Sequence, residues 1–203
     1  VSGYGADIYF CRPNLEAREK MLKEVVEKTG AVFVPPYDDP LVISGQGTAA
    51  MELLEEVSNL DVLMTPVGGG GLLSGTAIAA GALSPTTAVI AAEPAGADDA
   101  YRSLESGRLI PSKNPDTIAD GLLTSLSELT FSIIKEKVPG IVRVSEQGII
   151  AGMRLILERM KLVIEPSAAL PLGALLESRG EIPGSRIGII LSGGNVDLET
   201  LPF

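Results

Sequence analysis

The chain has 203 residues, and its 16 Lys and Arg against 26 Asp and Glu give a formal net charge of −10. This acidic balance argues against nucleic acid and anionic membranes as partners, because both carry negative charge themselves. With a single cysteine, Cys11, and no histidine, the sequence excludes a disulfide framework, a Ser-His-Asp triad and every histidine-ligated metal site.

The sequence carries no membrane or export signal. No apolar run approaches the ~18 residues of a membrane-spanning helix, and the first residues lack a signal-peptide pattern. We therefore expect a cytoplasmic protein. Because the sequence opens on Val1 and not on an initiator Met, we also expect it to begin partway through a longer polypeptide.

The first 60 residues read as two strands and two helices around a stiff connection. Hydrophobic periodicity predicts strands over 6–10 and 31–34, and helices over 14–28 and 48–57. Asn14 is the predicted N-cap of the first helix. The proline-rich polar stretch from Pro35 to Pro40 predicts a domain boundary.

From residue 61 onwards, short apolar strands alternate with helices. The predicted strands cover 61–67, 88–92, 141–144 and 187–191, and the predicted helices cover 72–83, a short stretch near Ala100, 129–138, 146–161 and 166–180. This alternation predicts an α/β fold, with an open, mostly parallel sheet covered by helices on both faces. Ligands bind such sheets at the carboxyl ends of the strands, where Gly68–Gly71, Glu93 and Ser192 stand.

Four consecutive glycines, Gly68–Gly71, connect a predicted strand to a predicted helix. Their N–H groups can converge on one point without Cβ clashes, and the helix start adds partial positive charge. The run matches neither G-x-x-x-x-G-K-[ST] nor G-x-G-x-x-G, which disfavours a nucleoside triphosphate or a dinucleotide. Because four glycines cost conformational entropy without an evident structural need, we favour a phosphate cradle over a simple turn.

The remaining candidates carry weaker signals. A neutral hydroxyl at Ser192 fits a bond to a ligand ring nitrogen, although a serine that caps a turn is more frequent. Glu93 and Asp99 fit a hard divalent cation, although their spacing alone favours a solvated acidic loop. Glu165, before Pro166, fits a ligand contact and a partner of the helix dipole equally well.

Seven segments together resemble serine racemase and the related serine/threonine dehydratases, which depend on pyridoxal 5′-phosphate (PLP). The segments are 44–48 (SGQGT), 66–72 (PVGGGGL), 92–94 (AEP), 96–99 (GADD), 117–121 (TIADG), 165–167 (EPS) and 191–198 (LSGGNVDL). The resemblance covers the whole chain. It implies the tryptophan-synthase β-like fold, fold type II, with 1–38 as the C-terminal part of the small domain and 39–203 as most of the large PLP-binding domain.

The resemblance implies a role for each candidate residue. It implies that backbone amides hold the PLP phosphate, at Gly68, Gly69, Gly70, Gly71 and Leu72. It implies that Ser192 takes the pyridine nitrogen, that Gly121 lines the ring and that Glu165 lies near it. It further implies a Mg²⁺ or Ca²⁺ site at Glu93, the Ala97 carbonyl and Asp99, and an ATP contact at the interface of a homodimer, through Tyr4, Lys161 and Asn195.

Two family segments have no counterpart in this sequence. They are the Ser-x-Lys-x-Arg-Gly segment, whose lysine forms the Schiff base, and the Ser-Gly-Asn loop that grips the substrate carboxylate. We therefore expect the C-terminal portion of the enzyme, inactive by itself, with no catalytic residue of its own.

The resemblance implies that the whole enzyme acts on small hydroxy amino acids (serine, threonine or 3-hydroxyaspartate) by racemisation and by β-elimination to a 2-oxo acid and ammonia. The alternative is a non-catalytic PLP- or phosphate-binding fragment or interaction module.

We expect Glu93→Ala to leave the stability of the cation-free protein nearly unchanged, because the substitution relieves the repulsion between the Glu93 and Asp99 carboxylates.

Overall fold

The computed structural model describes residues 2–12, 15–178 and 180–203. The chain divides into two compact units, Val1–Pro35 and Pro36–Phe203, and each unit is described by itself. The division falls inside the proline-rich connection. The identity of the two units as parts of a small and a large domain stays a prediction.

In the described part of the first unit, the regular structure is the helix α1 (Leu15–Thr29) and a short 3₁₀ turn, η1 (Ser2–Tyr4). The predicted first helix is thus confirmed, while its predicted cap, Asn14, lies outside the described residues. The strands predicted over 6–10 and 31–34 are wrong, since both segments are irregular. Phe10 and Val32 are 86% and 89% exposed, because no described segment of this unit offers them a strand to pair with.

The second unit is built on a sheet whose described strands all run parallel, in the order β3-β2-β1-β4. The strands are β1 (Val62–Pro66), β2 (Ala88–Pro94), β3 (Gly140–Val144) and β4 (Ile187–Ile189). Every residue of β1 is buried, as apolar strands covered on both faces require. The predicted α/β class is confirmed.

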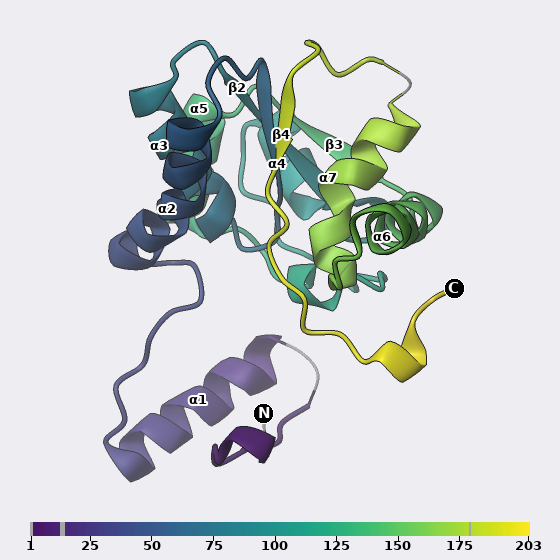
Figure 1. Ribbon diagram of the computed structural model, residues 1–203. Helices are drawn as coiled ribbons and strands as arrows, with labels where there is room; N and C mark the ends of the chain where they lie inside the picture. The colour runs from purple at the N-terminus through teal and green to yellow at the C-terminus, as the bar shows by residue number, and fades with distance from the viewer. Residues whose placement is uncertain (1, 13–14, 179) are drawn as a thin grey trace. The chain divides into compact units, whose positions relative to one another are not determined.

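Helices cover both faces of this sheet (Figure 1). One face carries α2 (Pro40–Glu56), α3 (Gly71–Leu83), α4 (Asp99–Ser106) and α5 (Glu128–Lys137), and the other carries α6 (Glu146–Met160) and α7 (Pro166–Glu177). Alternate residues of β1 divide between the two cores: Met64 packs toward α6 and α7, and Leu63 packs toward α2 and α3.

Helix α2 starts at Pro40, eight residues before the predicted helix at residue 48. The Asp39 side chain caps it by accepting from the N–H groups of Leu41 and Val42, at 2.8 and 3.2 Å. The glycines of this helix, which lower its intrinsic propensity, serve a close crossing with α3. A Cβ on Gly47 would lie only 2.9 Å from the carbonyl oxygen of Gly75.

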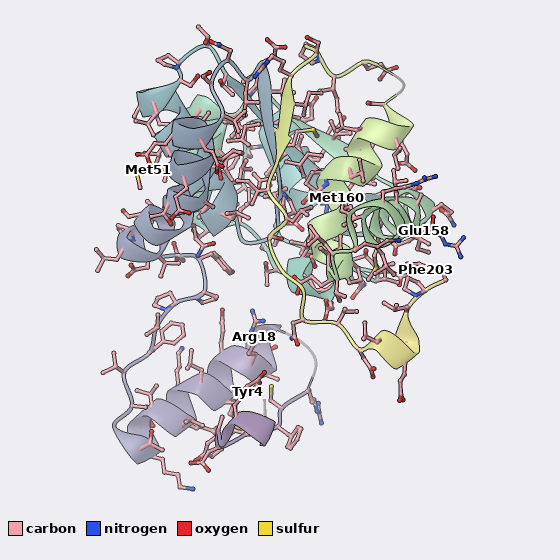
Figure 2. All side chains as sticks on the ribbon, viewed as in Figure 1. Tyr4, Arg18, Met51, Glu158, Met160 and Phe203 are labelled. Atoms are coloured by element: carbon pink, nitrogen blue, oxygen red, sulfur yellow. The ribbon has the colours of Figure 1, made fainter. Side chains whose placement is uncertain are left out.

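Because the strands are parallel, their carboxyl ends meet at one edge of the sheet. The glycine run follows β1, and Glu93 lies near the end of β2. The segment after β4 passes Ser192 and ends at Phe203, which is labelled in Figure 2. The ring of Phe203 lies 5.0 Å from the guanidinium of Arg154 on α6. None of the helices in the described ranges has both the length and the apolar character needed to cross a bilayer.

Candidate functional site

The glycine loop, residues 68–71, is buried and closely packed. A Cβ on Gly68 would lie 3.0 Å from Leu122 Cα, and a Cβ on Gly69 would overlap the ring of Tyr37. Gly70 has a φ of +88°, and a Cβ there would lie 2.8 Å from Leu126. The run therefore has a structural need of its own. The entropy argument for a ligand was wrong on this point, and the case for a ligand rests on hydrogen-bond donors.

Those donors are the N–H groups at the start of α3. Gly70 is the N-cap of this helix and has no side chain to cap it. The first bond within the helix runs from the Ser74 N–H to the Gly70 carbonyl, at 2.9 Å, and the N–H groups of the preceding turn have no acceptor within the helix. Gly70 and Gly71 are nevertheless buried. A buried helix start without a side-chain cap, carrying partial positive charge, fits a bound anion.

The predicted ring-lining residues lie next to this loop. Leu122, which packs on Gly68, follows Gly121 directly. A Cβ on Gly121 would lie 2.9 Å from the Ser167 hydroxyl and 3.6 Å from a carboxylate oxygen of Glu165. Gly121 therefore faces the start of α7, where Glu165 is the N-cap residue.

Glu165 in turn joins the start of α7 to the segment after β4. Its N–H donates to the Gly193 carbonyl at 3.1 Å, and its carboxylate accepts from the Asn195 N–H at 3.3 Å. Its carboxylate does not cap its own helix. Ser192, next to Gly193, is exposed. Through these contacts the structure brings together Gly68, Gly121, Glu165 and the neighbourhood of Ser192.

The sequence patterns did not identify two residues of this region as candidates. Glu146, in the first turn of α6, accepts the Ile118 N–H at 2.9 Å and so fixes the loop that leads to Gly121. Ser167 is 3% exposed, and its hydroxyl has no hydrogen-bond partner in the described part of the chain. The motif EPS marks Ser167, but nothing in the sequence relates Glu146 to residue 118, because the two are brought together by tertiary packing alone.

The two carboxylates near the end of β2 are buried. Glu93 and Asp99 are each 1% exposed, so the solvated loop that their spacing favoured is wrong. Both oxygens of Glu93 accept backbone N–H groups at the start of α4, from Ala100 at 2.8 Å and from Tyr101 at 2.7 Å. The expectation for Glu93→Ala therefore needs correction: removing this side chain leaves two N–H groups without their acceptor and destabilises α4.

Burial also sets the charge state of this pair. It raises the pKa of Glu93 to about 8, against the opposing effect of the Tyr101 and Ala100 N–H groups. Burial likewise raises the pKa of Asp99 to about 6. Neither Asp99 oxygen has a hydrogen-bond partner of good geometry within the described residues.

The acid pair suits a hard cation. Carboxylate oxygens are the type of donor that Mg²⁺ and Ca²⁺ take, and the predicted third donor is the carbonyl of Ala97, a residue that is also buried. A cation would also remove the electrostatic penalty of two buried carboxylates. In the described ranges, no three acidic, histidine or cysteine side chains gather into a metal site, so such an ion depends on the backbone carbonyl.

Comparison with known proteins decides the family. The family model described as pyridoxal-phosphate dependent enzyme matches residues 2–193. This chain belongs to that family. Within this PLP-dependent family, its fold agrees with that of maize serine racemase, at 41% identity and a TM-score of 0.93, over 98% of this chain and 62% of the other.

Two curated relatives are similar in sequence. The serine racemase of Dictyostelium discoideum is 52% identical over 99% of this chain and 63% of its own length. The beta-hydroxyaspartate dehydratase of Paracoccus denitrificans is 46% identical over 100% of this chain and 64% of its own length. The chain thus spans a little under two thirds of the length of these relatives.

The three residues expected to contact ATP are placed as follows. Tyr4 belongs to the first unit and is 95% exposed. Lys161, just after α6, donates from Nζ to the Glu158 carbonyl at 2.7 Å, and Asn195 uses its backbone N–H on Glu165. The side chain of Lys161 is therefore engaged at the end of its own helix, and its role toward a nucleotide stays a prediction.

Proposed function

We propose that this chain supplies the cofactor-binding part of a PLP-dependent enzyme that racemises or dehydrates small hydroxy amino acids. The observation that carries the proposal is the buried start of α3 without a side-chain cap, placed beside Gly121 and near Glu165. The names of the relatives, a serine racemase and a beta-hydroxyaspartate dehydratase, support serine and 3-hydroxyaspartate as substrates to test. The sequence resemblance adds threonine.

Each residue of the site has a distinct task in this proposal. The N–H groups of Gly68–Leu72 bind the phosphate, Gly121 lines the ring, and Glu165 holds the Gly193 and Asn195 backbone in place. The Ser192 hydroxyl bonds the ring nitrogen without giving it a full positive charge. When bound, PLP supplies an electron sink for bonds at the amino-acid α-carbon, and a neutral partner at the nitrogen moderates that sink.

Three finer features belong to the same proposal. A Mg²⁺ or Ca²⁺ ion is held by Glu93, the Ala97 carbonyl and Asp99, and its support is the buried, incompletely bonded acid pair. We also propose a cytoplasmic homodimer with ATP as an effector at Tyr4, Lys161 and Asn195, which rests on the sequence resemblance. No nucleic acid or membrane partner is proposed.

The test uses the full-length polypeptide that carries this chain, loaded with PLP and supplied separately with serine, threonine and 3-hydroxyaspartate. Chiral chromatography would measure racemisation, and release of 2-oxo acid would measure dehydration. We expect turnover of at least one substrate, and none from residues 1–203 alone. PLP binding without turnover of any of the three would favour the alternative, a non-catalytic cofactor-binding protein, and absence of PLP binding would overturn the proposal.

A further inference from the structure

A buried threonine on α5 holds the backbone of the glycine loop. The hydroxyl of Thr130 donates to the Gly69 carbonyl oxygen at 2.9 Å, across 61 positions of sequence. Thr130 is 0% exposed, so water does not compete for this bond. It is a tertiary contact between the first turn of α5 and the middle of the glycine loop.

The start of α5 fixes the direction of this hydroxyl. Ser127 and Thr130 form a capping box, in which the Thr130 Oγ1 accepts the Ser127 N–H at 3.0 Å. A hydroxyl has one hydrogen to donate. The Gly69 carbonyl oxygen, at 2.9 Å, is a closer acceptor for it than the Ser127 hydroxyl oxygen, at 3.1 Å, or the Ser127 carbonyl oxygen, at 3.4 Å. The Ser127 hydroxyl has a hydrogen of its own and can donate it to the Thr130 Oγ1. The cap therefore aims the Thr130 donor at the loop.

Holding the Gly69 carbonyl also orients the next N–H group. The C=O and N–H of a trans peptide point in opposite directions, and the described chain contains no cis peptide. With the Gly69 carbonyl turned toward Thr130, the Gly70 N–H must point away from α5. Leu126 and Ile134 close the α5 side, since a Cβ on Gly70 would lie 2.8 and 3.0 Å from their side chains.

Such a lock is needed because this peptide lies between two glycines. Glycine accepts both signs of φ, so the 69–70 peptide could turn over at little conformational cost. Turned over, it would present a carbonyl oxygen, and not an N–H, on the side away from α5. An anion bound there would then meet a repulsive dipole in place of a donor.

We propose that Thr130 is a positioning residue for the phosphate of PLP, acting through the 69–70 peptide. The proposal rests on the proposed function, because it assumes that the phosphate lies at the glycine loop. It predicts that Thr130 affects the part of the affinity that comes from the phosphate and leaves the part that comes from the ring unchanged.

The experiment compares PLP with pyridoxal, which lacks the phosphate, in the full-length enzyme. Fluorescence titration gives Kd for both ligands in the wild type, Thr130→Val and Thr130→Ser. We expect Thr130→Val to weaken PLP at least about tenfold and to leave pyridoxal unchanged, since the loss corresponds to one hydrogen bond to a charged group. Thr130→Ser retains the hydroxyl and should stay within about twofold of the wild type for both ligands.

Thr87 provides the matched control. Its buried hydroxyl donates to the Leu60 carbonyl at 2.7 Å, at the opposite end of the strands. Thr87→Val removes a comparable bond, so it should lower the melting temperature to a similar degree without changing the ratio of the two Kd values. The ³¹P chemical shift of bound PLP gives a second readout, which should move in Thr130→Val and not in Thr87→Val. If Thr130→Val does not fold, Thr130→Ala serves, because it removes the same hydroxyl without adding a methyl group.

The experiment distinguishes a failure of the proposed phosphate site from a failure of the proposed role of Thr130. A wild type that binds PLP no more tightly than pyridoxal would overturn the phosphate cradle itself, and with it this inference. A wild type that prefers PLP, together with a Thr130→Val that retains the same preference and ³¹P shift, would overturn the role of Thr130 alone.

Discussion

Two loops leave the same edge of the sheet from neighbouring strands, and they bury groups of opposite character. After β1, the glycine loop brings backbone donors to the start of α3 without a side-chain acceptor. Around the end of β2, Glu93 reaches the start of α4 and accepts its Ala100 and Tyr101 N–H groups. A helix start is open to an anionic ligand only where the fold supplies no acid of its own, so α3 fits a phosphate and α4 does not.

The comparison extends to what each loop lacks. The glycine loop has donors in excess and is held by close packing and by one hydroxyl, that of Thr130. The acidic loop has acceptors in excess, because the Asp99 oxygens find no good hydrogen-bond donor among the described residues. A bound anion would therefore stabilise the glycine loop, and a bound cation would stabilise the acidic loop. The following substitutions and conditions test that contrast.

The largest effect is expected from Gly70→Ala. Its φ of +88° disfavours any L side chain, and the new Cβ would meet Leu126 and Thr130 below 3.0 Å. We expect the free energy of unfolding to fall by about 2–4 kcal/mol, as measured by urea denaturation. Gly81→Ala, in the same helix with nothing within 4 Å of its Cβ, should instead stabilise by about 0.5–1 kcal/mol. Equal effects of the two changes would contradict the packing described for the loop.

The acidic loop should make stability depend on pH in the absence of a divalent cation. The folded-state pKa values of about 8 for Glu93 and about 6 for Asp99 lie above the ordinary 4.5 and 3.8. The folded state therefore holds these protons more tightly, and the stability they contribute at low pH is lost as pH rises, mainly from pH 4 to 6 for Asp99 and from 4.5 to 8 for Glu93. The slope approaches about 1.4 kcal/mol per pH unit for each group.

Urea denaturation in EDTA from pH 5 to 8 would measure this slope, with Glu93→Gln as the comparison. The variant should lose the part of the slope that persists above pH 6. Millimolar Mg²⁺ should raise wild-type stability most at pH 8, because the proposed site would bind the ion through the ionised pair and in the folded state only. An unchanged slope in Glu93→Gln, or an equal Mg²⁺ response in both proteins, would show that Glu93 is not the responsible group.

A smaller effect is expected where Glu146 fixes the loop before Gly121. Glu146→Ala removes the acceptor of the Ile118 N–H, and we expect a loss of about 1–2 kcal/mol in unfolding free energy with a few-fold weaker PLP binding. Glu136→Ala, at an exposed pair with Lys137, should change either quantity very little. Unaltered PLP affinity in Glu146→Ala would separate this loop from the cofactor site.

The smallest effect is expected at the surface of the acidic loop. Arg143 lies 3.3 Å from a carboxylate oxygen of Asp98 and stacks on Tyr101, with 4.5 Å from its guanidinium carbon to the ring centroid. The Arg143 side chain is 49% exposed, so solvent screens the ion pair. Arg143→Leu should cost less than about 1 kcal/mol by thermal unfolding. A loss comparable to that of Gly70→Ala would mean that surface charge, and not burial, holds this loop.

The parts of the fold that a short pattern determines were predictable. Strand β1, the glycine loop and α3 follow from an apolar run, four glycines and a stretch of small residues. The early start of α2 was missed, although Asp39 before Pro40 is a capping signal, because Gly45 and Gly47 lowered the expected helix propensity. The strands expected over 6–10 and 31–34 failed because a strand forms only beside a partner, which their own residues do not reveal.

The sequence predicted which residues form the candidate site, and this membership stays a prediction, whereas the hydrogen bonds between those residues could not be predicted. The motifs marked Gly68–Leu72, Gly121, Glu165 and Ser192, of which the glycine run follows β1 and Ser192 follows β4. The helix cap formed by Glu93 and the hydroxyl bond from Thr130 were not predictable, since each depends on which N–H or carbonyl the fold presents to a distant side chain. For the acid pair, spacing gave no measure of burial, and burial is what changes its pKa.

The close crossing of α2 and α3 at Gly47 and Gly75 has a consequence for amide hydrogen exchange. Backbone lies against backbone there, so neither helix can lose a turn at the crossing without exposing the other. The two helices should therefore open as one cooperative unit, and their protected amide hydrogens should show a common free energy of opening once intrinsic exchange rates are corrected for. That unit includes the first turn of α3, so the donors of the glycine loop remain in place whenever α2 is folded.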